Sequence, residues 1–247
     1  MNNEVIKLTD VSFSNIDYLV LDNINVSIYL HSFTAIIGKS GAGKSTLLKL
    51  MSGILTPTKG KVEIYGRDIH NLETKEILSI KKKLGFAFQD SALLSNLTIR
   101  ENLSLPLRFH FKNITEEYMN KKITEYLEKV NLMDSIDLRP AQLSLGEQKM
   151  VSLIRALIID PEILFIDEAL SNIDPSLRKV IINLIKEYAE KPWTTVVGVT
   201  HNKKILETLA TRILVVDEKR IKIDITKEEL LENKNFYNCS ILQDIFD

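Results

Sequence analysis

A glycine-rich segment between two apolar runs constrains the fold of this chain more than any other feature. The segment GKSGAGKST, residues 38–46, follows the apolar run TAII at 34–37 and precedes LLKLM at 47–51. Apolar runs on both sides of a short glycine-rich turn are typical of a buried strand joined to a helix. Glycines let backbone N–H groups close around a phosphate at a helix N-terminus. The segment therefore predicts a phosphate-binding loop in an α/β fold.

The spacing inside this loop assigns tasks to single residues. Gly38, Gly43 and Lys44 stand at the spacing G-x-x-x-x-G-K-[ST]. We expect Lys44 to reach the β and γ phosphates of a nucleotide, and the Ser45 hydroxyl to bind Mg²⁺. The predicted nucleotide-binding residues of the loop are Gly38, Ser40, Gly41, Ala42, Gly43, Lys44, Ser45 and Thr46.

The bulk composition narrows the class of protein. A chain of 247 residues with 45% hydrophobic residues can bury the core of one large α/β domain. Its 32 basic and 33 acidic residues leave a net charge of -1, which gives no electrostatic reason to expect nucleic-acid binding. The single cysteine, Cys239, excludes an internal disulfide, and the first residues lack the layout of a signal peptide. Both features indicate the cytoplasm.

No apolar run approaches the roughly 20 residues that cross a bilayer. We therefore expect no direct membrane insertion, and any membrane role to go through a partner. Strands are expected at 5–8, 20–28, 33–37, 61–65, 84–88, 163–166, 194–199 and 212–216, with helices at 44–52, 149–159 and 227–233. From residue 96 to about 161 the pattern changes to helices, most clearly over Thr115–Val130, where Thr115 is a start signal.

A second motif of chemical interest is the apolar strand ILFI at 163–166, which ends in Asp167 and Glu168. In a parallel sheet the carboxyl ends of the strands line the ligand crevice. Asp167 is therefore expected to face Mg²⁺ and Glu168 to face the attacking water.

The segment LSLGE at 143–147 has two interpretations. Ser144 and Glu147 fit a capping box, S-x-x-E, at the start of a helix. A helix N-terminus with a serine hydroxyl and a glycine is also a site for an anion. If Glu147 folds back onto the cap, its charge does not oppose a phosphate there.

Together these pieces resemble the ATP-binding-cassette ATPases, from about Val5 to Asp224. In the order of that family the chain carries GKSGAGKST, GFAFQ ending at Gln89, LSLGE in place of LSGGQ, LFIDE, SNID at 171–174 in place of SALD, and His201 after a strand. The resemblance implies an α/β fold with a P-loop NTPase (RecA-like) core and a small antiparallel β subdomain at 1–90 and 161–247. It also implies an inserted helical subdomain at 91–160, which carries the signature segment.

The resemblance also implies roles for the residues at matching positions. Two ATP molecules are each held between the phosphate loop of one subunit and the LSLGE segment of the other, in a homodimer or a paired cassette. Glu168 is then the general base, Gln89 senses Mg²⁺ and the γ-phosphate, and His201 holds the γ-phosphate. Ser144 and Gly146 contact that phosphate across the interface, and Asp174 ties the two sites together. The implied cofactors are ATP and Mg²⁺; the implied residues are catalytic Glu168, His201, Gln89 and Lys44, signature residues Ser144, Gly146 and Glu147, and metal-binding Ser45, Gln89 and Asp167.

Three of the chain's departures from the family pattern bear on its expected nucleotide sites. Leu145 replaces the first glycine of LSGGQ, and Ala169 stands where proline usually follows the glutamate. Asn15 stands near the place of the aromatic residue that stacks on adenine. Tyr18 is the alternative for that stacking, or it is a half-exposed strand residue.

The stretch after Gln89, residues 91–108, resembles most the ATPases of Mla-type lipid transporters, which work with proteins carrying the Mce domain. This resemblance implies a subunit peripheral to the cytoplasmic face of the inner or plasma membrane, which drives a permease in the transport of phospholipid or another hydrophobic molecule. Ala92, Leu93 and Leu94 are expected either to form a groove for that permease or to make core contacts. Four alternatives to a lipid-transport ATPase stay open. They are the ATPase of a small-solute importer, that of a lipoprotein-release or cell-division complex, a soluble ATPase without a transport role, and a scaffold that only binds ATP.

Overall fold

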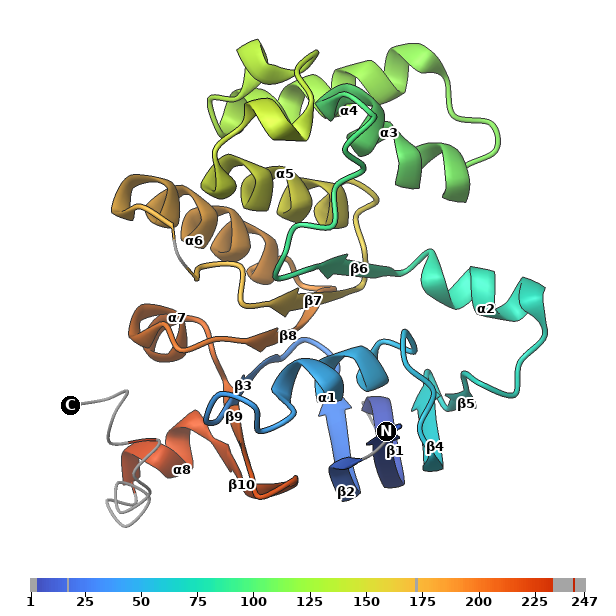
Figure 1. The fold of residues 1–247 in the computed structure, drawn as a ribbon, viewed down its shortest axis with the longest axis vertical. Coiled ribbons are helices and arrows are strands. Elements are labelled where there is room, and N and C mark those ends of the chain that lie inside the picture. The colour runs from blue at the N-terminus through green and yellow to red at the C-terminus, as the bar shows by residue number, and fades with distance from the viewer. Residues whose placement is uncertain (1–3, 17, 172, 233–241, 243–247) are drawn as a thin grey trace. The chain divides into compact units, whose positions relative to one another are not determined.

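The computed structural model describes residues 4–16, 18–171, 173–232 and 242 (Figure 1). By compactness the chain divides into two units, one formed by residues 1–77 and 189–247 and the other by residues 78–188. This division does not test the expected subdomain boundaries at 90/91 and 160/161, which stay a prediction. Cys239 and Asn172 lie outside the described residues.

In the first unit, four strands form an antiparallel sheet in the order β2-β1-β4-β5. Ile6 pairs with Ile28 and Leu8 with Val26, and all four side chains are buried. The first two strands are longer than predicted because their pairing continues through the polar Asp10, where the backbone has φ 52° and the register shifts. The strands are β1 (Glu4–Asn15), β2 (Tyr18–Tyr29), β4 (Lys59–Ile64) and β5 (Arg67–Asp68).

The first unit also contains four strands in the order β10-β9-β3-β8. Strand β3 runs parallel to both β8 and β9, whereas β9 and β10 are antiparallel. Every residue of β3 and β8 is buried, as is typical of strands covered on both faces. The strands are β3 (Phe33–Ile37), β8 (Thr195–Val199), β9 (Arg212–Asp217) and β10 (Arg220–Thr226); helices α1 (Lys44–Met51), α7 (Lys203–Thr208) and α8 (Lys227–Glu232) belong to the same unit.

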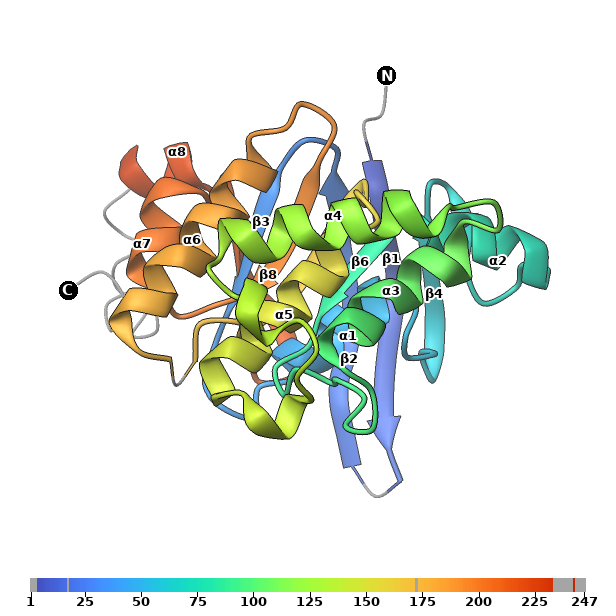
Figure 2. The ribbon, with the colours of Figure 1, turned by 90° about the horizontal axis from the view of Figure 1, so that it is seen from above.

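The second unit combines two parallel strands with helices, and Figure 2 shows α3, α4 and α5 beside one another. A Cβ atom on Gly85 in β6 would lie 2.4 Å from the carbonyl oxygen of Ala156 in α5. The helix therefore packs this closely on the strand because residue 85 has no side chain. The elements are β6 (Leu84–Ala87), α3 (Ile99–His110), α4 (Glu116–Lys129), α5 (Leu145–Leu157), β7 (Ile163–Asp167), α6 (Pro175–Ala189) and two 3₁₀ turns at Met133–Ser135 and Pro140–Gln142, while α2 (Thr74–Lys81) runs from the first unit into the second.

Two helix predictions have different outcomes. The helix expected over Thr115–Val130 is confirmed, since the Thr115 side chain caps α4 and Met119, Ile123 and Leu127 are buried. The start expected at Lys149 is wrong. Helix α5 begins at Leu145, because the capping box at Ser144 satisfies the first N–H groups one turn earlier.

The loop before α3 is held by one buried amide, Asn102, which has no solvent exposure. Its Nδ2 donates to the carbonyl oxygens of Leu94, Leu97 and Thr98 at 3.1, 3.3 and 3.0 Å. Its Oδ1 accepts from the N–H of Leu94 at 2.8 Å. One side chain thus fixes the backbone of residues 94–98.

We predict that Asn102→Leu lowers the free energy of unfolding by roughly 1–3 kcal/mol, because buried backbone groups lose their partner. Urea titration followed by circular dichroism measures this change. Asn113→Leu is the control, since Asn113 is exposed in the same unit. Equal midpoints for the two variants would contradict the prediction.

Candidate active site

The glycine-rich segment forms a turn between β3 and α1 that only glycine permits at two points. A Cβ atom on Gly38 would lie 2.2 Å from the carbonyl oxygen of Val216. Gly43 has φ 95° and precedes the first residue of α1. The first turn of α1 contains no acidic residue, so the positive end of the helix dipole is not offset there. The predicted strand–loop–helix context of the segment is therefore observed.

Lys44 is the buried cation of this loop, with only 6% of its surface exposed. Its Nζ donates to the carbonyl oxygens of Gly38 and Lys39, each at 2.8 Å. The ammonium group thus lies within the curve of the loop. Ser45 and Thr46 are half-buried in the first helical turn, and Ser40 and Gly41 are exposed on the loop.

His201 follows the strand next to this loop. Ile36 in β3 pairs with Val199 in β8, so Gly38 and His201 each stand two residues beyond a paired position. His201 is exposed at this edge. Parallel pairing thus brings the loop and His201 to the carboxyl ends of adjacent strands, where ligands bind in open α/β sheets.

In the second unit, parallel pairing joins the other strand-end residues. Ala87 in β6 pairs with Ile166 in β7, and Gln89 and Glu168 each follow two residues later. Gln89 Nε2 donates to Glu168 Oε2 at 3.3 Å. Asp167 ends β7 and is only 2% exposed, whereas Glu168 is half-buried. The structure therefore brings together Gln89 and Glu168, two of the residues to which the resemblance assigns roles.

Glu168 has an unusual backbone conformation, with φ 46°. Its carbonyl oxygen accepts hydrogen bonds from Ser171 Oγ at 2.9 Å and from the Ser171 N–H at 3.1 Å. Lys149 of α5 donates to Ser171 O at 2.5 Å and to Ser171 Oγ at 2.7 Å. Sequence analysis did not single out Lys149 or Ser171 for a role. Their contact joins a helix to a loop 22 residues away, so no local pattern could have found it.

The signature segment starts α5. The Glu147 N–H donates to Ser144 Oγ at 3.3 Å, and the Ser144 N–H donates to Glu147 Oε2 at 2.8 Å. The predicted capping box is therefore confirmed, and Glu147 does fold back onto the cap. Leu145 is 70% exposed. A Cβ atom on buried Gly146 would lie 2.6 Å from Ile173 Cγ2, so this glycine packs against the chain's own loop.

The structure also describes the surroundings of Asp174, Asn15 and Tyr18, which the sequence singles out. Asp174 Oδ1 accepts from the N–H groups of Ser176 and Leu177 at 2.9 and 3.1 Å, at the start of α6. The hydrogen bonds of the Ser176 side chain and of these N–H groups lower the pKa of the Asp174 carboxyl group. Asn15 pairs with Tyr18 where β1 turns into β2, and Tyr18 is 62% exposed. The Tyr18 ring is therefore accessible.

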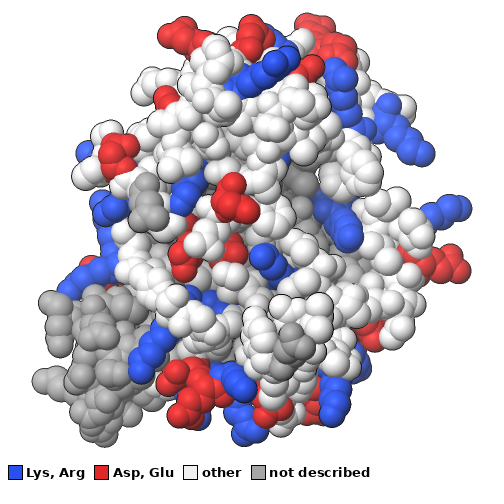
Figure 3. Space-filling view, viewed as in Figure 1, with Lys and Arg blue, Asp and Glu red and all other residues white. Residues whose placement is uncertain are grey.

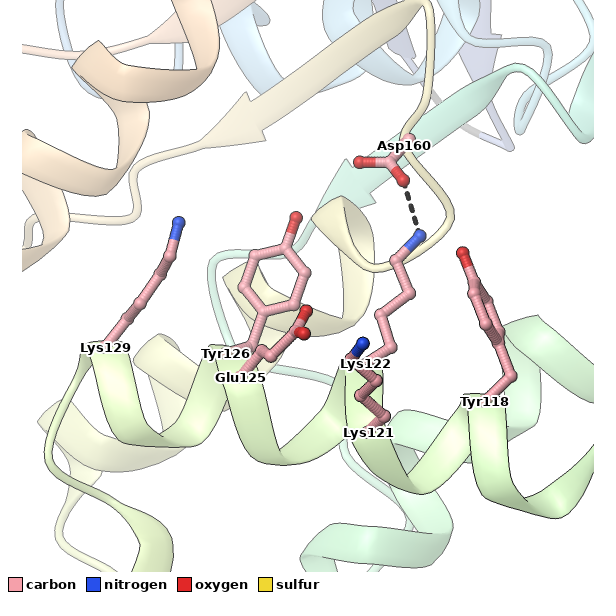
Figure 4. A pocket seen from close by; sticks show the side chains of 7 residues that line it. All are labelled: Tyr118, Lys121, Lys122, Glu125, Tyr126, Lys129 and Asp160. Atoms are coloured by element: carbon pink, nitrogen blue, oxygen red, sulfur yellow. Dashed lines mark hydrogen bonds and ion pairs between the residues drawn. The ribbon is translucent and has the colours of Figure 1, made fainter.

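A hollow of about 350 Å³ over α4 is a competing candidate site, which Figure 4 shows at close range. Two of its three lysines are paired, Lys122 with Asp160 and Lys129 with Glu187. Burial raises the pKa of Tyr126, whose hydroxyl donates to the carbonyl oxygen of Leu157 at 3.4 Å. On the face seen in Figure 3, basic and acidic side chains are likewise interspersed. Several of the hollow's polar groups thus already have protein partners, so the phosphate loop of the first unit and the strand ends of the second unit are each better candidates.

Comparison with known proteins agrees with this assignment. The family model described as ABC transporter matches residues 21–171, which is more than half of the chain. The intermembrane phospholipid transport system ATP-binding protein MlaF of Haemophilus influenzae is 31% identical over 95% of this chain and 89% of that protein. The methionine import ATP-binding protein MetN of Haemophilus ducreyi is 36% identical over 82% of this chain. The chain spans 58% of the length of that MetN protein.

A solved structure extends the comparison to three dimensions. The ATP-binding cassette MJ0796, a dimer in a post-hydrolysis state bound to ADP and Pi, superposes with a TM-score of 0.83. It is 31% identical in sequence, and the match covers 90% of this chain and 98% of that one. Since the family model, a nearly full-length relative and the fold all agree, this chain belongs to the ABC transporter family as an ATPase domain.

Proposed function

We propose that the chain is the ATP-hydrolysing nucleotide-binding subunit of a transporter, which dimerises on ATP and drives a separate membrane-spanning partner. The observation that carries the proposal is the hydrogen bond from Gln89 to Glu168 at the paired ends of β6 and β7. It holds a carboxylate at a strand end, where a base that takes a proton from water is required. Gln89 then reports the state of that carboxylate to the segment that follows it.

In this proposal the first unit binds the phosphates of ATP. The loop N–H groups and the Lys44 ammonium stabilise the charge that develops on the transferred phosphoryl group. Lys44 exchanges its two carbonyl partners for phosphate oxygens, which are stronger acceptors because they are charged. His201 donates to the γ-phosphate from the neighbouring strand end.

The residues proposed for Mg²⁺ have suitable chemistry. Asp167 supplies a carboxylate that is 2% exposed, and Ser45 supplies a hydroxyl in the first turn of α1. Oxygen ligands of this kind suit Mg²⁺, which completes its shell with phosphate oxygens and water. Within the described part of the chain no group of three or more His, Cys, Asp or Glu side chains forms a metal cluster. In this proposal Asp167 and Ser45 would hold a metal that arrives with ATP, where it would neutralise phosphate charge.

The signature segment provides the dimer contact in this proposal. Ser144 and the first N–H groups of α5 face the nucleotide of the partner subunit, because a helix N-terminus attracts anions. Glu147 directs its carboxylate to the Ser144 N–H, so its charge is partly offset by the cap. Gly146 keeps the segment packed on Ile173.

An apolar groove near Gln89 is the proposed site of the permease. The groove has a volume of about 460 Å³ and is lined by the rings of Phe86, Phe88 and Phe109 and by Leu94 and Leu105. Phe109 is 66% exposed and Leu94 is 47% exposed. Exposed apolar side chains gathered in one groove favour a helical segment of a partner. Of the three residues expected there, Leu94 lines the groove, whereas the exposed Ala92 and the half-buried Leu93 are not among its lining residues.

We favour phospholipid or another hydrophobic molecule as the cargo, since the MlaF relative matches almost the whole length of both chains. Methionine or another small solute is the second candidate, because MetN proteins also match with 36% identity. No described helix is both long and apolar enough to cross a membrane. We place the subunit on the cytoplasmic face of the inner or plasma membrane, held there by its permease.

The first prediction concerns the proposed base. Glu168→Gln keeps the shape of the side chain but removes its basicity, so we expect the rate of ATP hydrolysis to fall by at least about 100-fold. The variant should still bind ATP and accumulate as an ATP-bound dimer. Steady-state phosphate release and size-exclusion chromatography with ATP measure the two effects.

Glu117→Gln is the matched control, since Glu117 is exposed in the first turn of α4. It should retain the activity and the oligomeric state of the unmodified protein. Full activity in Glu168→Gln would exclude Glu168 as the base.

The second prediction concerns the phosphate loop. Lys44→Met removes the buried ammonium, so ATP affinity should fall by about 10-fold or more, as expected for loss of a charge-assisted hydrogen bond. Equilibrium titration with a fluorescent ATP analogue measures the affinity. Lys39→Met, at an exposed position of the same loop, should bind like the unmodified protein. Similar ATP affinities for the unmodified protein, Lys44→Met and Lys39→Met would contradict the role assigned to Lys44.

The third prediction concerns the groove. Phe109→Ser should reduce co-purification with the membrane partner by about 10-fold, because it removes an exposed aromatic anchor. Quantitative mass spectrometry of the tagged protein from detergent-solubilised membranes measures this loss. Tyr118→Ser is the control, since Tyr118 is 55% exposed on α4. ATP binding should be unchanged in both variants. A larger loss in Tyr118→Ser would place the partner elsewhere.

A further inference from the structure

A continuous series of hydrogen bonds runs from helix α5 to the proposed base. Lys149 Nζ donates to both oxygens of Ser171, at 2.5 Å to the carbonyl and 2.7 Å to Oγ. Ser171 Oγ and the Ser171 N–H donate in turn to the carbonyl oxygen of Glu168, at 2.9 and 3.1 Å. One lysine therefore connects the signature helix to the turn that carries Glu168.

This turn needs support from its neighbours. Glu168 has φ 46°, in the left-handed region that residues other than glycine rarely occupy. Such a conformation persists where surrounding contacts hold it. The two hydrogen bonds from Ser171 stabilise the Glu168 backbone in this conformation, and the hydrogen bond from Gln89 fixes the Glu168 carboxylate. The direction of the Glu168 side chain therefore depends on where Ser171 lies.

Electrostatics add to this geometry. Desolvation lowers the pKa of the partly buried Lys149, and the negative charge of Glu168 opposes that shift. The ammonium group therefore contributes to the electrostatic environment of the Glu168 carboxylate. Replacing it changes both the position and the electrostatic environment of that carboxylate.

We infer that Lys149 is a positioning residue that transmits movement of the signature helix to Glu168. The inference rests on the proposed function. In a head-to-tail dimer, Ser144 meets the nucleotide held by the partner, whereas Glu168 acts on the subunit's own nucleotide. Ser144 caps α5 and Lys149 lies within it, about one and a half turns further on. Lys149 thus couples occupancy of one nucleotide site to the base of the other.

Four variants test this inference. Lys149→Met keeps an apolar stem of similar length and removes the ammonium, and Lys149→Arg restores a cation with several donors. Ser171→Ala removes the hydroxyl that links Lys149 to Glu168. Lys179→Met is the matched control, because Lys179 is exposed on α6 of the same unit.

The first measurement is hydrogen exchange in the nucleotide-free protein. In Lys149→Met the amide of Ser171 should exchange about 10-fold faster, because its hydrogen bond to Glu168 opens more often. Lys149→Arg should recover part of the protection, and Lys179→Met should match the unmodified protein. Unchanged exchange in Lys149→Met would overturn the inference whether or not the protein hydrolyses ATP.

The second measurement is ATP hydrolysis as a function of ATP concentration. Lys149→Met should lower kcat by about 10-fold with KM changed less than about 2-fold, since a misplaced base affects the chemical step. Its Hill coefficient should fall toward about 1, because the coupling between the sites is lost. In the Glu168→Gln background, Lys149→Met should still form the ATP-bound dimer.

The double variant Lys149→Met with Ser171→Ala should be no slower than the slower single variant, because both changes break one series of contacts. If the losses of kcat in the two single variants add up in the double variant, the two residues act independently and the inference is overturned. The same holds if Lys149→Met loses the ATP-bound dimer to the same extent as kcat, because the substitution then damages the fold in general. An unmodified protein that neither binds nor hydrolyses ATP would overturn the proposed function and the coupling together. Normal hydrolysis by Lys149→Met would overturn the coupling alone.

Discussion

The site depends on the complete burial of three parallel strands. Every residue of β3, β7 and β8 is buried, so these strands have no side chain that faces solvent for chemistry. Apart from the buried Thr34 and Thr195, polar side chains stand at the residues where these strands end or at those that directly follow them. Parallel pairing then brings residues that follow adjacent strands to the same height along the strand direction. These residues are Gly38 and His201 in the first unit, and Gln89 and Glu168 in the second. The same apolar contacts that stabilise the strands thus determine which functional residues can meet.

The sequence predicts correctly those structural features that depend on residues within one short segment. The capping box at Ser144 and the strand at 33–37 could be recognised because each depends on residues within one short segment. The predicted start of α5 at Lys149 is too late, because the capping box at Ser144 defines the first turn of the helix. The strand predicted at 5–8 is shorter than β1, because the polar Thr9 and Asp10 interrupt the apolar pattern while the pairing with β2 continues past them. Strand β10 alternates between exposed and half-buried positions and was missed for the same reason.

In the candidate site, too, features set by nearby residues can be predicted, whereas contacts between residues far apart in the chain cannot. Gln89, Asp167, Glu168 and His201 could be predicted, because each is marked by its order among motifs and by the strand before it. Their hydrogen-bond partners could not all be predicted. Lys149 and Ser171 meet only because α5 and the loop after β7 pack together, with Gly146 close to Ile173. That packing involves residues far apart in the chain, and a single sequence contains no direct sign of it.

The two positions of the family's paired glycines differ in what the fold requires of them. At residue 146 an added Cβ atom would lie 2.6 Å from Ile173 Cγ2 and 2.8 Å from Leu177 Cδ1, so a side chain there would force these neighbours to shift. At residue 145 the leucine is 70% exposed and directly follows the cap, so the fold accepts a bulky side chain. The departure at Leu145 therefore imposes no packing penalty within the subunit. Any effect it has must arise from what approaches the N-terminus of α5, where an exposed apolar side chain adds bulk beside the first backbone N–H groups and offers no hydrogen-bond donor of its own to a phosphate.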